Sequence, residues 1–226
     1  VPVKDTLYPK NLKAIAKFAD TLFIERFYPE IELFLHDDSL HPDRKIDIIF
    51  TGSSSIRKWR NLNKDFNDFN VLNRGFGGST IPEIIFYAKE LIIKHSPSEI
   101  VFYTGENDIT STNTDTIKVV QSFEYFQALI KKELPQSHIF FVSLKPSPSR
   151  WNWWPEMQRI NKKIKFLCDS ADNCSYIDVS AAMLNKNGDV LKHVFEADQL
   201  HLNKKGYSIW TKIIREALER KIDKGL

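Results

Sequence analysis

The sequence is poor in glycine. It contains 8 glycines among 226 residues, whereas the usual frequency of ~7% would give about sixteen. Five of the eight lie in three short segments, at Gly52, at Gly75, Gly77 and Gly78, and at Gly105. We therefore expect the chain to need glycine at these positions.

Cysteine is scarce as well. The two cysteines, Cys168 and Cys174, exclude a disulfide-rich scaffold and a four-cysteine zinc site. We expect two buried thiols. A single local disulfide in an oxidising compartment is the alternative.

Long apolar runs and a strong net charge are also missing. No stretch of ~18 apolar residues is present, so no transmembrane segment is expected. The sequence shows no signal-peptide pattern and starts with Val1, which leaves the compartment open between cytoplasmic and secreted or periplasmic after processing. The net charge of +3 is too small to indicate a nucleic-acid partner, and nothing in the sequence sets the oligomeric state.

The chain does contain enough hydrophobic residues for a large core, and they are arranged in segments that alternate between strand-like and helix-like patterns. A hydrophobic content of 42% and an aromatic content of 12% exclude a disordered chain, and the length fits one domain. Short apolar runs alternate with longer stretches whose apolar residues follow helical spacing, which predicts an α/β fold with a five-stranded parallel sheet. The expected strands are Ile46–Phe50, Asn70–Asn73, Ile100–Tyr103, Ile139–Val142 and Tyr176–Val179, and the expected helices cover Leu12–Phe27, Ile31–Leu40, Thr80–Ile92 (opened by a capping box of Thr80 and Glu83), Asp115–Leu134, Pro155–Leu167 and Tyr207–Leu218.

The segments that follow the expected strands hold the unusual residues. Ligands of parallel sheets bind beyond the carboxyl ends of the strands. Three of these segments, 51–56, 73–80 and 105–109, contain the clustered glycines, 145–154 is rich in tryptophan, and 180–203 contains Asp198 and His201. We therefore expect the functional site at this edge of the sheet.

Three consecutive serines, Ser53, Ser54 and Ser55, follow the first strand and Gly52. A serine on a tight strand-to-helix turn exposes its hydroxyl at the top of the sheet, as a nucleophile needs. The alternative is a polar turn with helix-capping serines. Ile56 stands where the nucleophile elbow Gly-x-Ser-x-Gly requires a second glycine, which disfavours an α/β-hydrolase.

Two further turns offer hydrogen-bond donors. The segment 75–80 lacks the third glycine of a dinucleotide fingerprint, since that position is Thr80, but it enters a helix and its backbone N–H groups suit an oxyanion. In the segment 105–108, Asn107 can direct its side-chain amide to the same place. The alternatives are an ordinary tight turn and an Asx-turn. Glu106 and Asp108 could form an acid pair for glycoside chemistry, but neighbouring turn residues point in different directions.

A histidine with a nearby carboxylate precedes the last helix. Asp198 can reach Nδ1 of His201, three residues on, and leave Nε2 free as a base. A surface turn is the alternative, and His193 is the only rival base. No grouping of His, Cys and carboxylates has metal-site spacing, so no metal is expected.

Aromatic residues cluster in the segment after the fourth strand. Trp151, Trp153 and Trp154 beside Arg150 suggest a pocket wall, with a core role as the alternative for one or two of them. Arg150 and Lys145 are candidates for contact with an acidic or carbohydrate substrate.

Taken together, four segments resemble the SGNH hydrolase superfamily, the GDSL-like esterases and acylhydrolases. They are Thr51-Gly-Ser-Ser-Ser-Ile56, Asn73-Arg-Gly-Phe-Gly-Gly-Ser-Thr80, Gly105-Glu-Asn-Asp108 and Asp198-Gln-Leu-His201. The resemblance implies a three-layer, flavodoxin-like α/β/α sandwich. One departure is Ser53, which stands where the family has Asp in its Gly-Asp-Ser motif.

By position, the resemblance implies Ser54 as nucleophile, His201 as base and Asp198 as its partner. The oxyanion hole would combine the backbone N–H groups of Ser54 and Gly78 with the Asn107 side chain. The expected activity is cleavage of short-chain acyl esters of a small molecule, carbohydrate or lipid, without a cofactor. A catalytically inactive carbohydrate- or lipid-binding module on the same fold is the alternative. We expect one domain over 1–226, with residues 1–45 as a helical N-terminal extension packed on it.

Overall fold

A five-stranded sheet forms the centre of the molecule. The computed structural model describes residues 24–110 and 115–223. The strands are β1 (Ile48–Gly52), β2 (Val71–Gly75), β3 (Glu99–Tyr103), β4 (His138–Val142) and β5 (Cys174–Ile177). All are parallel, in the order β2-β1-β3-β4-β5, which is the flavodoxin-like order.

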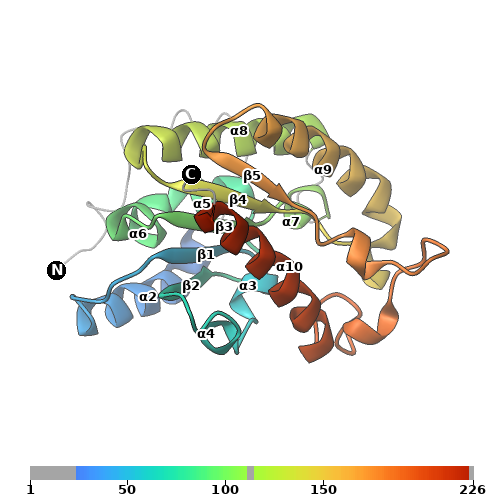
Figure 1. Cartoon of the computed structure of the whole chain (residues 1–226), viewed down its shortest axis with the longest axis horizontal. Helices are drawn as coiled ribbons and strands as arrows, with labels where there is room; N and C mark the ends of the chain where they lie inside the picture. The colour runs from blue at the N-terminus through green and yellow to red at the C-terminus, as the bar shows by residue number, and fades with distance from the viewer. Residues whose placement is uncertain (1–23, 111–114, 224–226) are drawn as a thin grey trace.

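Helices cover both faces of this sheet (Figure 1). The α-helices are α2 (Tyr28–Leu40), α3 (Ser54–Arg57), α4 (Leu62–Asp65), α5 (Ile81–Phe86), α6 (Ala88–Leu91), α7 (Glu106–Thr110), α8 (Thr116–Glu133), α9 (Trp154–Asp169) and α10 (Lys204–Asp223). Short 3-10 helices are η2 (Ile24–Phe27), η3 (Ile93–His95), η4 (Pro148–Trp153), η5 (Ala181–Met183) and η6 (Lys192–Val194).

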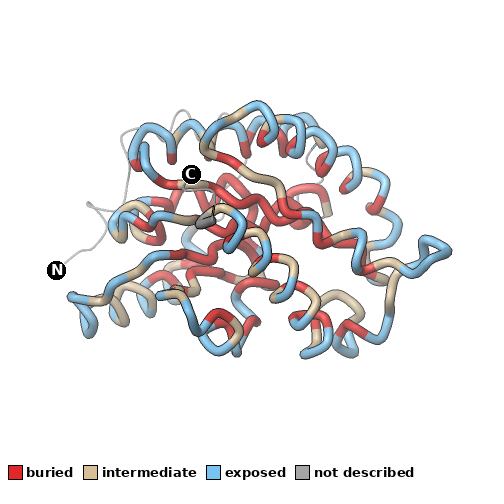
Figure 2. The backbone as a smooth tube through the Cα atoms, in the orientation of Figure 1, coloured by how far each residue is buried: buried red, intermediate tan, exposed pale blue. Residues whose placement is uncertain are grey.

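Alternating side chains of the strands build two separate cores. In β3, Ile100 and Phe102 face the core made with α2, α5, α6, α8 and α9. The intervening Val101 and Tyr103 face the core made with α3, α4 and α10. Successive strand residues point to opposite faces, so the sheet is buried on both sides, as the red strands of Figure 2 show. This confirms the predicted three-layer α/β/α sandwich.

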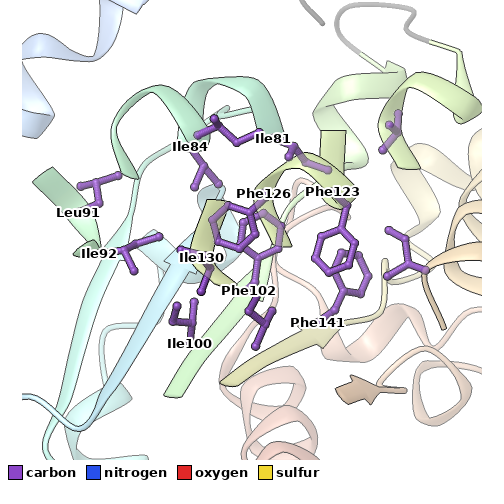
Figure 3. Packing of buried hydrophobic residues seen from close by; sticks show 14 of the residues in the cluster. Ile81, Ile84, Leu91, Ile92, Ile100, Phe102, Phe123, Phe126, Ile130 and Phe141 are labelled. Carbon is purple, nitrogen blue, oxygen red and sulfur yellow. The ribbon is translucent and has the colours of Figure 1, made fainter. Parts of the chain in front are cut away.

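Aromatic stacking fills the core between the sheet and α8. The Phe102 and Phe126 rings are stacked with centroids 4.3 Å apart, and Phe123 meets Phe141 edge-on at 4.8 Å. Figure 3 shows these rings with the isoleucines of α5 and of β3. Each such buried side chain contributes about 1.5–3 kcal/mol of hydrophobic stabilisation. The helical spacing read from the sequence therefore identifies the buried faces.

The order of the strands determines where the site lies. β1 pairs with β2 on one side and β3 on the other, and in the ladder Gly52 is opposite both Gly75 and Tyr103. The three strands thus end level with one another, and the segments after them meet at one edge. The chain order reverses at β1, which is where ligands of such sheets bind.

Several element boundaries differ from the prediction. β1 and β2 run on through Gly52 and Gly75, since the parallel ladder holds both glycines as strand residues. β5 ends at Ile177, because the Asp178 carboxylate accepts hydrogen bonds from the N–H and hydroxyl of Ser180 and turns the chain out of the sheet. The expected helix over 80–92 begins at the predicted capping box but is interrupted at Tyr87, where ψ is 11°.

The prediction of two buried thiols is wrong. Cys168 near the end of α9 and Cys174 at the start of β5 form a disulfide. A short turn between these elements brings their Cα atoms to 4.7 Å, within the range that a disulfide needs.

The N-terminal part is described only from residue 24. The expected helix Leu12–Phe27 lies outside the described residues except for its last turn, η2. α2 corresponds to the second expected helix, and Phe27 and Ile31 are buried in the core. The buried Arg74 of β2 forms an ion pair with Asp38 of α2. η2 and α2 therefore pack against the core on one face of the sheet.

Candidate active site

A strained glycine precedes the serine turn. Gly52 has a φ of +147°, and a Cβ there would lie 2.0 Å from the carbonyl oxygen of Tyr103. Only glycine fits this conformation and this contact. The next residue, Ser53, donates its N–H to the same carbonyl at 3.0 Å, and its own carbonyl accepts the N–H groups of Ile56 and Arg57 to start α3. Ser54 is the first residue of α3 and is partly exposed.

Ser54, His201 and Asp198 form a continuous chain of hydrogen bonds. The Ser54 Oγ lies 2.9 Å from Nε2 of His201, and Nδ1 of His201 lies 2.5 Å from Oδ2 of Asp198. Ser54 and His201 are 147 residues apart in sequence. The fold therefore brings the predicted nucleophile, base and carboxylate together, in the geometry that a nucleophilic serine needs.

The carboxylate of Asp198 is well satisfied. Its Oδ1 accepts the backbone N–H groups of Leu200 and His201, both at 2.9 Å. Partial burial favours the neutral acid, but the hydrogen bonds from the His201 ring and from these two amides outweigh it and hold the pKa of Asp198 well below its usual range. Asp198 is therefore ionised at neutral pH, as a carboxylate that orients a histidine must be.

The two neighbouring serines have other contacts. Ser55 is buried, and its carbonyl accepts the hydroxyl of Tyr207 at 2.9 Å. Ser53 is also buried and caps α3 through its backbone. Among the three consecutive serines, Ser54 is the one whose hydroxyl contacts His201. The rival base, His193, lies exposed in η6, where its carbonyl accepts a hydrogen bond from Asn203.

The second turn packs tightly against the first. A Cβ at Gly75 would lie 2.5 Å from the backbone nitrogen of Arg57, and one at Gly77 would lie 2.8 Å from the Arg57 guanidinium. These glycines thus allow the turn after β2 to approach α3. Gly78 has a φ of +80° with open space around a Cβ, so its need for glycine is conformational.

The start of α5 is occupied by carboxylates of this chain. The N–H of Thr80 donates to Glu83 at 2.8 Å, and that of Ile81 donates to Asp108 at 3.1 Å. These N–H groups are unavailable to an oxyanion, which corrects the expectation that the helix terminus serves as a donor. Burial raises the pKa of Asp108 to about 7. Glu106 points elsewhere, so the two acids form no pair.

Asn107 is buried between two polar partners. Its Nδ2 donates to the Ser79 carbonyl at 3.0 Å, and its Oδ1 accepts from Nη2 of Arg150 at 2.9 Å. The side chain is therefore fixed next to the turn that carries Gly78. Of the predicted oxyanion donors, Asn107 is the one whose orientation is most fully determined.

Lys145 and Arg150, the two cations expected to contact substrate, form ion pairs with a carboxylate of this chain. Arg150 donates Nη1 to Glu106 at 3.0 Å, and the fully buried Lys145 donates to Glu106 at 2.9 Å. Tyr103 donates its hydroxyl to the same carboxylate. Burial alone would favour the neutral acid, but the charges of Lys145 and Arg150 hold the pKa of Glu106 below its usual value. A substrate contact for Lys145 is thus excluded by its burial.

The tryptophans divide between surface and core. Trp151 is 39% exposed, whereas Trp154 is 7% exposed and belongs to the core beneath the sheet. Trp153 is partly buried against that core. The core alternative therefore holds for Trp154, whereas a role in a pocket wall stays a prediction for the exposed Trp151 and the partly exposed Trp153.

Sequence reasoning missed how Tyr103, Glu106 and Lys145 come together. Lys145 begins an unusual Lys-Pro-Ser-Pro-Ser-Arg run three residues after the end of β4, which was a signal of a special role. No spacing in the sequence links it to Glu106, 39 residues away. Within residues 24–110 and 115–223, no three His, Cys, Asp or Glu side chains gather as metal ligands. In the same ranges no helix is long and apolar enough to cross a membrane.

Comparison with solved structures gives the same fold. A candidate acylhydrolase from Bacteroides fragilis has a TM-score of 0.72 at 16% identity, covering 89% of this chain and 99% of that chain. A carbohydrate esterase family 3 structure from Talaromyces cellulolyticus has a TM-score of 0.65 at 15% identity, covering 79% and 99%. A variant of an acetyl-xylooligosaccharide esterase from Geobacillus Stearmophilus has a TM-score of 0.60 at 14% identity, covering 76% and 94%. At these identities the likeness shows the fold alone.

Comparison by sequence identifies the family. No curated protein matches this chain, but the model of the GDSL-like Lipase/Acylhydrolase family matches residues 49–209. The matched range contains the serine turn after β1, both glycine turns and the Asp198–His201 loop. This chain therefore belongs to the GDSL-like lipase/acylhydrolase family.

Proposed function

We propose that this chain is a serine esterase that cleaves short-chain acyl esters, such as acetyl esters, through an acyl-enzyme. Ser54 is the nucleophile, His201 the general base and Asp198 the carboxylate that orients it. The observation that carries the proposal is the unbroken chain of hydrogen bonds from Ser54 Oγ through His201 to Asp198. Membership of a family of lipases and acylhydrolases supports the same chemistry.

The reaction follows from the positions of the donors and acceptors. His201 takes the proton of Ser54 through Nε2 while Ser54 Oγ attacks the ester carbonyl, and Asp198 stabilises the imidazolium that forms. His201 then returns the proton to the leaving alcohol. Water, deprotonated by His201, then attacks the acyl carbon. The bond from that carbon to Ser54 Oγ breaks, His201 returns the proton to Ser54, and the carboxylic acid leaves.

The negative charge of the tetrahedral intermediate needs donors. We assign them to the backbone N–H groups of Ser54 and Gly78 and to the free N–H of the Asn107 amide. All three lie on segments that leave neighbouring strands at the same level. One such donor typically contributes a factor of 10²–10³ in rate.

For the alcohol part of the substrate we propose a carbohydrate. The two esterases of similar fold from Talaromyces and Geobacillus act, by their descriptions, on carbohydrate esters. The exposed Trp151 ring, stacked on Trp154 at 6.5 Å between centroids, provides a flat apolar face of the kind on which sugar rings pack.

We also propose that the chain is a single hydrolase domain with residues 1–45 as an N-terminal extension, supported by the burial of Phe27 and Ile31.

Hydrolysis of p-nitrophenyl acetate by single-serine variants tests the proposal. Ser54→Ala is expected to abolish turnover, whereas Ser53→Ala and Ser55→Ala, which remove neighbouring hydroxyls, are expected to keep most of it. Thermal unfolding of each variant shows whether the fold is intact. Full activity of a folded Ser54→Ala would refute the assignment. A panel of acetylated sugars and p-nitrophenyl esters of increasing acyl length then separates carbohydrate from lipid substrates.

A further inference from the structure

A cluster of buried charges lies directly behind Asn107. Glu106 accepts hydrogen bonds from Lys145 at 2.9 Å and from Arg150 at 3.0 Å, and both Glu106 and Lys145 are almost inaccessible to solvent. One carboxylate thus meets two cations. The cluster carries a net charge of +1 beside the site, and Glu106 supports no step of the reaction described above.

We propose that Arg150 is a positioning residue that orients and polarises the Asn107 amide as an oxyanion donor. This inference rests on the proposed esterase function. The Arg150 guanidinium uses Nη1 on Glu106 and Nη2 on the Asn107 oxygen. A planar guanidinium holds two acceptors at once in a fixed geometry, which an ammonium group cannot do. Glu106 therefore orients the Arg150 guanidinium, and Arg150 in turn orients the Asn107 amide.

The chemistry of arginine also fixes which way the amide points. A guanidinium has donors only, so the atom of Asn107 that faces it is the oxygen. Nδ2 consequently faces the other way, where one N–H is taken by the Ser79 carbonyl. The second N–H remains for a ligand. Because the amide oxygen accepts a hydrogen bond from the Arg150 cation, electron density is drawn from the amide nitrogen. The N–H groups of this nitrogen therefore become stronger hydrogen-bond donors.

The same segment also contacts the loop of the acid and base. The N–H of Ser149 donates to the carbonyl of Gln199 at 3.1 Å. Gln199 lies between Asp198 and His201 and has a φ of +55°, a conformation that a non-glycine residue keeps only when its surroundings hold it. Neighbouring residues of η4 therefore touch the oxyanion side and the His201 side of the site. The contact on the His201 side uses backbone atoms of Ser149 and Gln199, so replacing the Arg150 side chain removes only the contact to Asn107 and the ion pair with Glu106.

A double-mutant cycle between Arg150 and Asn107 tests the proposal in the full chain with p-nitrophenyl acetate. Arg150→Met is expected to lower kcat by roughly 10- to 100-fold, less than loss of a whole oxyanion donor, with KM changed less than two-fold. Asn107→Ala is expected to lower kcat by ~10²–10³. If Arg150 acts through Asn107, the double variant has the kcat of Asn107→Ala alone.

Arg215→Met is the matched control. Arg215 is similarly half-buried and bridges α10 to Asp68 at 2.6 Å and to the Asp65 carbonyl at 2.7 Å, but it contacts no proposed site residue. Its removal is expected to lower the thermal midpoint without lowering kcat. Should Arg150→Met not fold, Arg150→Gln, which keeps a neutral donor, replaces it in the cycle.

The possible results are distinguishable. Equal kcat in the Arg150 and Arg215 variants, or losses that multiply in the double variant, would overturn the role of Arg150. A kcat deficit that disappears when Asn107 is already removed supports it. Failure of the esterase proposal itself shows in a different measurement, the full activity of Ser54→Ala.

Discussion

Within residues 24–110 and 115–223, two serine hydroxyls lie at hydrogen-bond distance from a histidine ring, at opposite ends of the sheet. At the carboxyl end, Ser54 Oγ lies 2.9 Å from Nε2 of His201. At the amino end, Ser175 Oγ lies 2.9 Å from Nε2 of His138, which opens β4. The two contacts are equal in length. A serine hydroxyl beside an imidazole therefore does not by itself identify a catalytic site.

The surroundings of the two histidines differ. His201 has the Asp198 carboxylate on its other ring nitrogen. Among residues 24–110 and 115–223, no carboxylate hydrogen-bonds to His138. Burial and the charge of Lys221 lower the pKa of His138 to about 4, so its ring resists taking up the proton that a general base must accept. Only the Ser54 pair, moreover, follows a turn strained at Gly52 and lies beside the two glycine turns.

The largest expected contrast comes from replacing each histidine in turn. His201→Gln removes the proposed base, and we expect kcat to fall by ~10⁴ or more. His138→Gln removes a ring that supports no step, so kcat should stay within two-fold. Initial rates with p-nitrophenyl acetate measure both. Comparable losses in the two variants would erase the distinction drawn between the pairs.

Removing the carboxylate tests the feature that separates the pairs. Asp198→Asn keeps the shape but no longer holds the His201 tautomer or stabilises its charged form. We expect kcat to fall by ~10³–10⁴ while the fold, followed by circular dichroism, is retained. An Asp198→Asn enzyme with near-normal turnover would mean that the carboxylate is incidental.

A pair of glycines provides a smaller contrast. Gly78 and Gly188 have φ values of +80° and +85°, and a Cβ added at either position would lie in open space. Alanine at either position should therefore cost about 1 kcal/mol of stability. Only Gly78→Ala should also lower kcat, by roughly 10-fold, because it moves a proposed oxyanion N–H. Unfolding in urea and steady-state kinetics separate the two effects, and equal kinetics in both variants would remove Gly78 from the oxyanion hole.

A last contrast concerns stability in acid and leaves turnover unchanged. The pKa of His138 is about 4 in the folded chain and near 6.5 when unfolded. As the pH falls from 6.5 towards 4, the unfolded state binds a proton that the folded state does not, and stability is lost. His138→Gln should reduce this loss by about 2 kcal/mol, measured by urea unfolding at pH 7 and pH 4.5. An identical pH dependence in wild type and variant would show that His138 titrates normally.

Much of the fold is visible in the sequence because it rests on periodic patterns. Ile84 and Leu91 are recognisable as core residues since their spacing follows a helix. The break in this helix at Tyr87 depends on packing, and the repeat of apolar residues in the sequence does not show it. The parallel sheet follows from alternation alone. The disulfide was missed because pairing of Cys168 with Cys174 depends on the short turn that joins α9 to β5.

The site is predictable only in part. Ser54, Asn107 and His201 are marked by their places after strands and by the resemblance to a family. The ion cluster is different, since Glu106, Lys145 and Arg150 come from separate segments and meet only in the folded chain. The sequence therefore predicted a substrate contact for Lys145 and Arg150, whereas the structure pairs both with the buried carboxylate of Glu106.

Covalent labelling shows directly whether Ser54 is the activated serine. The protein is treated with a fluorophosphonate, digested with trypsin, and the adduct is located by fragment-ion mass spectrometry. We expect one adduct, on Ser54 within the peptide Ile46–Arg57, and no adduct in His201→Gln. An adduct on Ser53, Ser55 or Ser175, or an active enzyme that takes up no label, would contradict it.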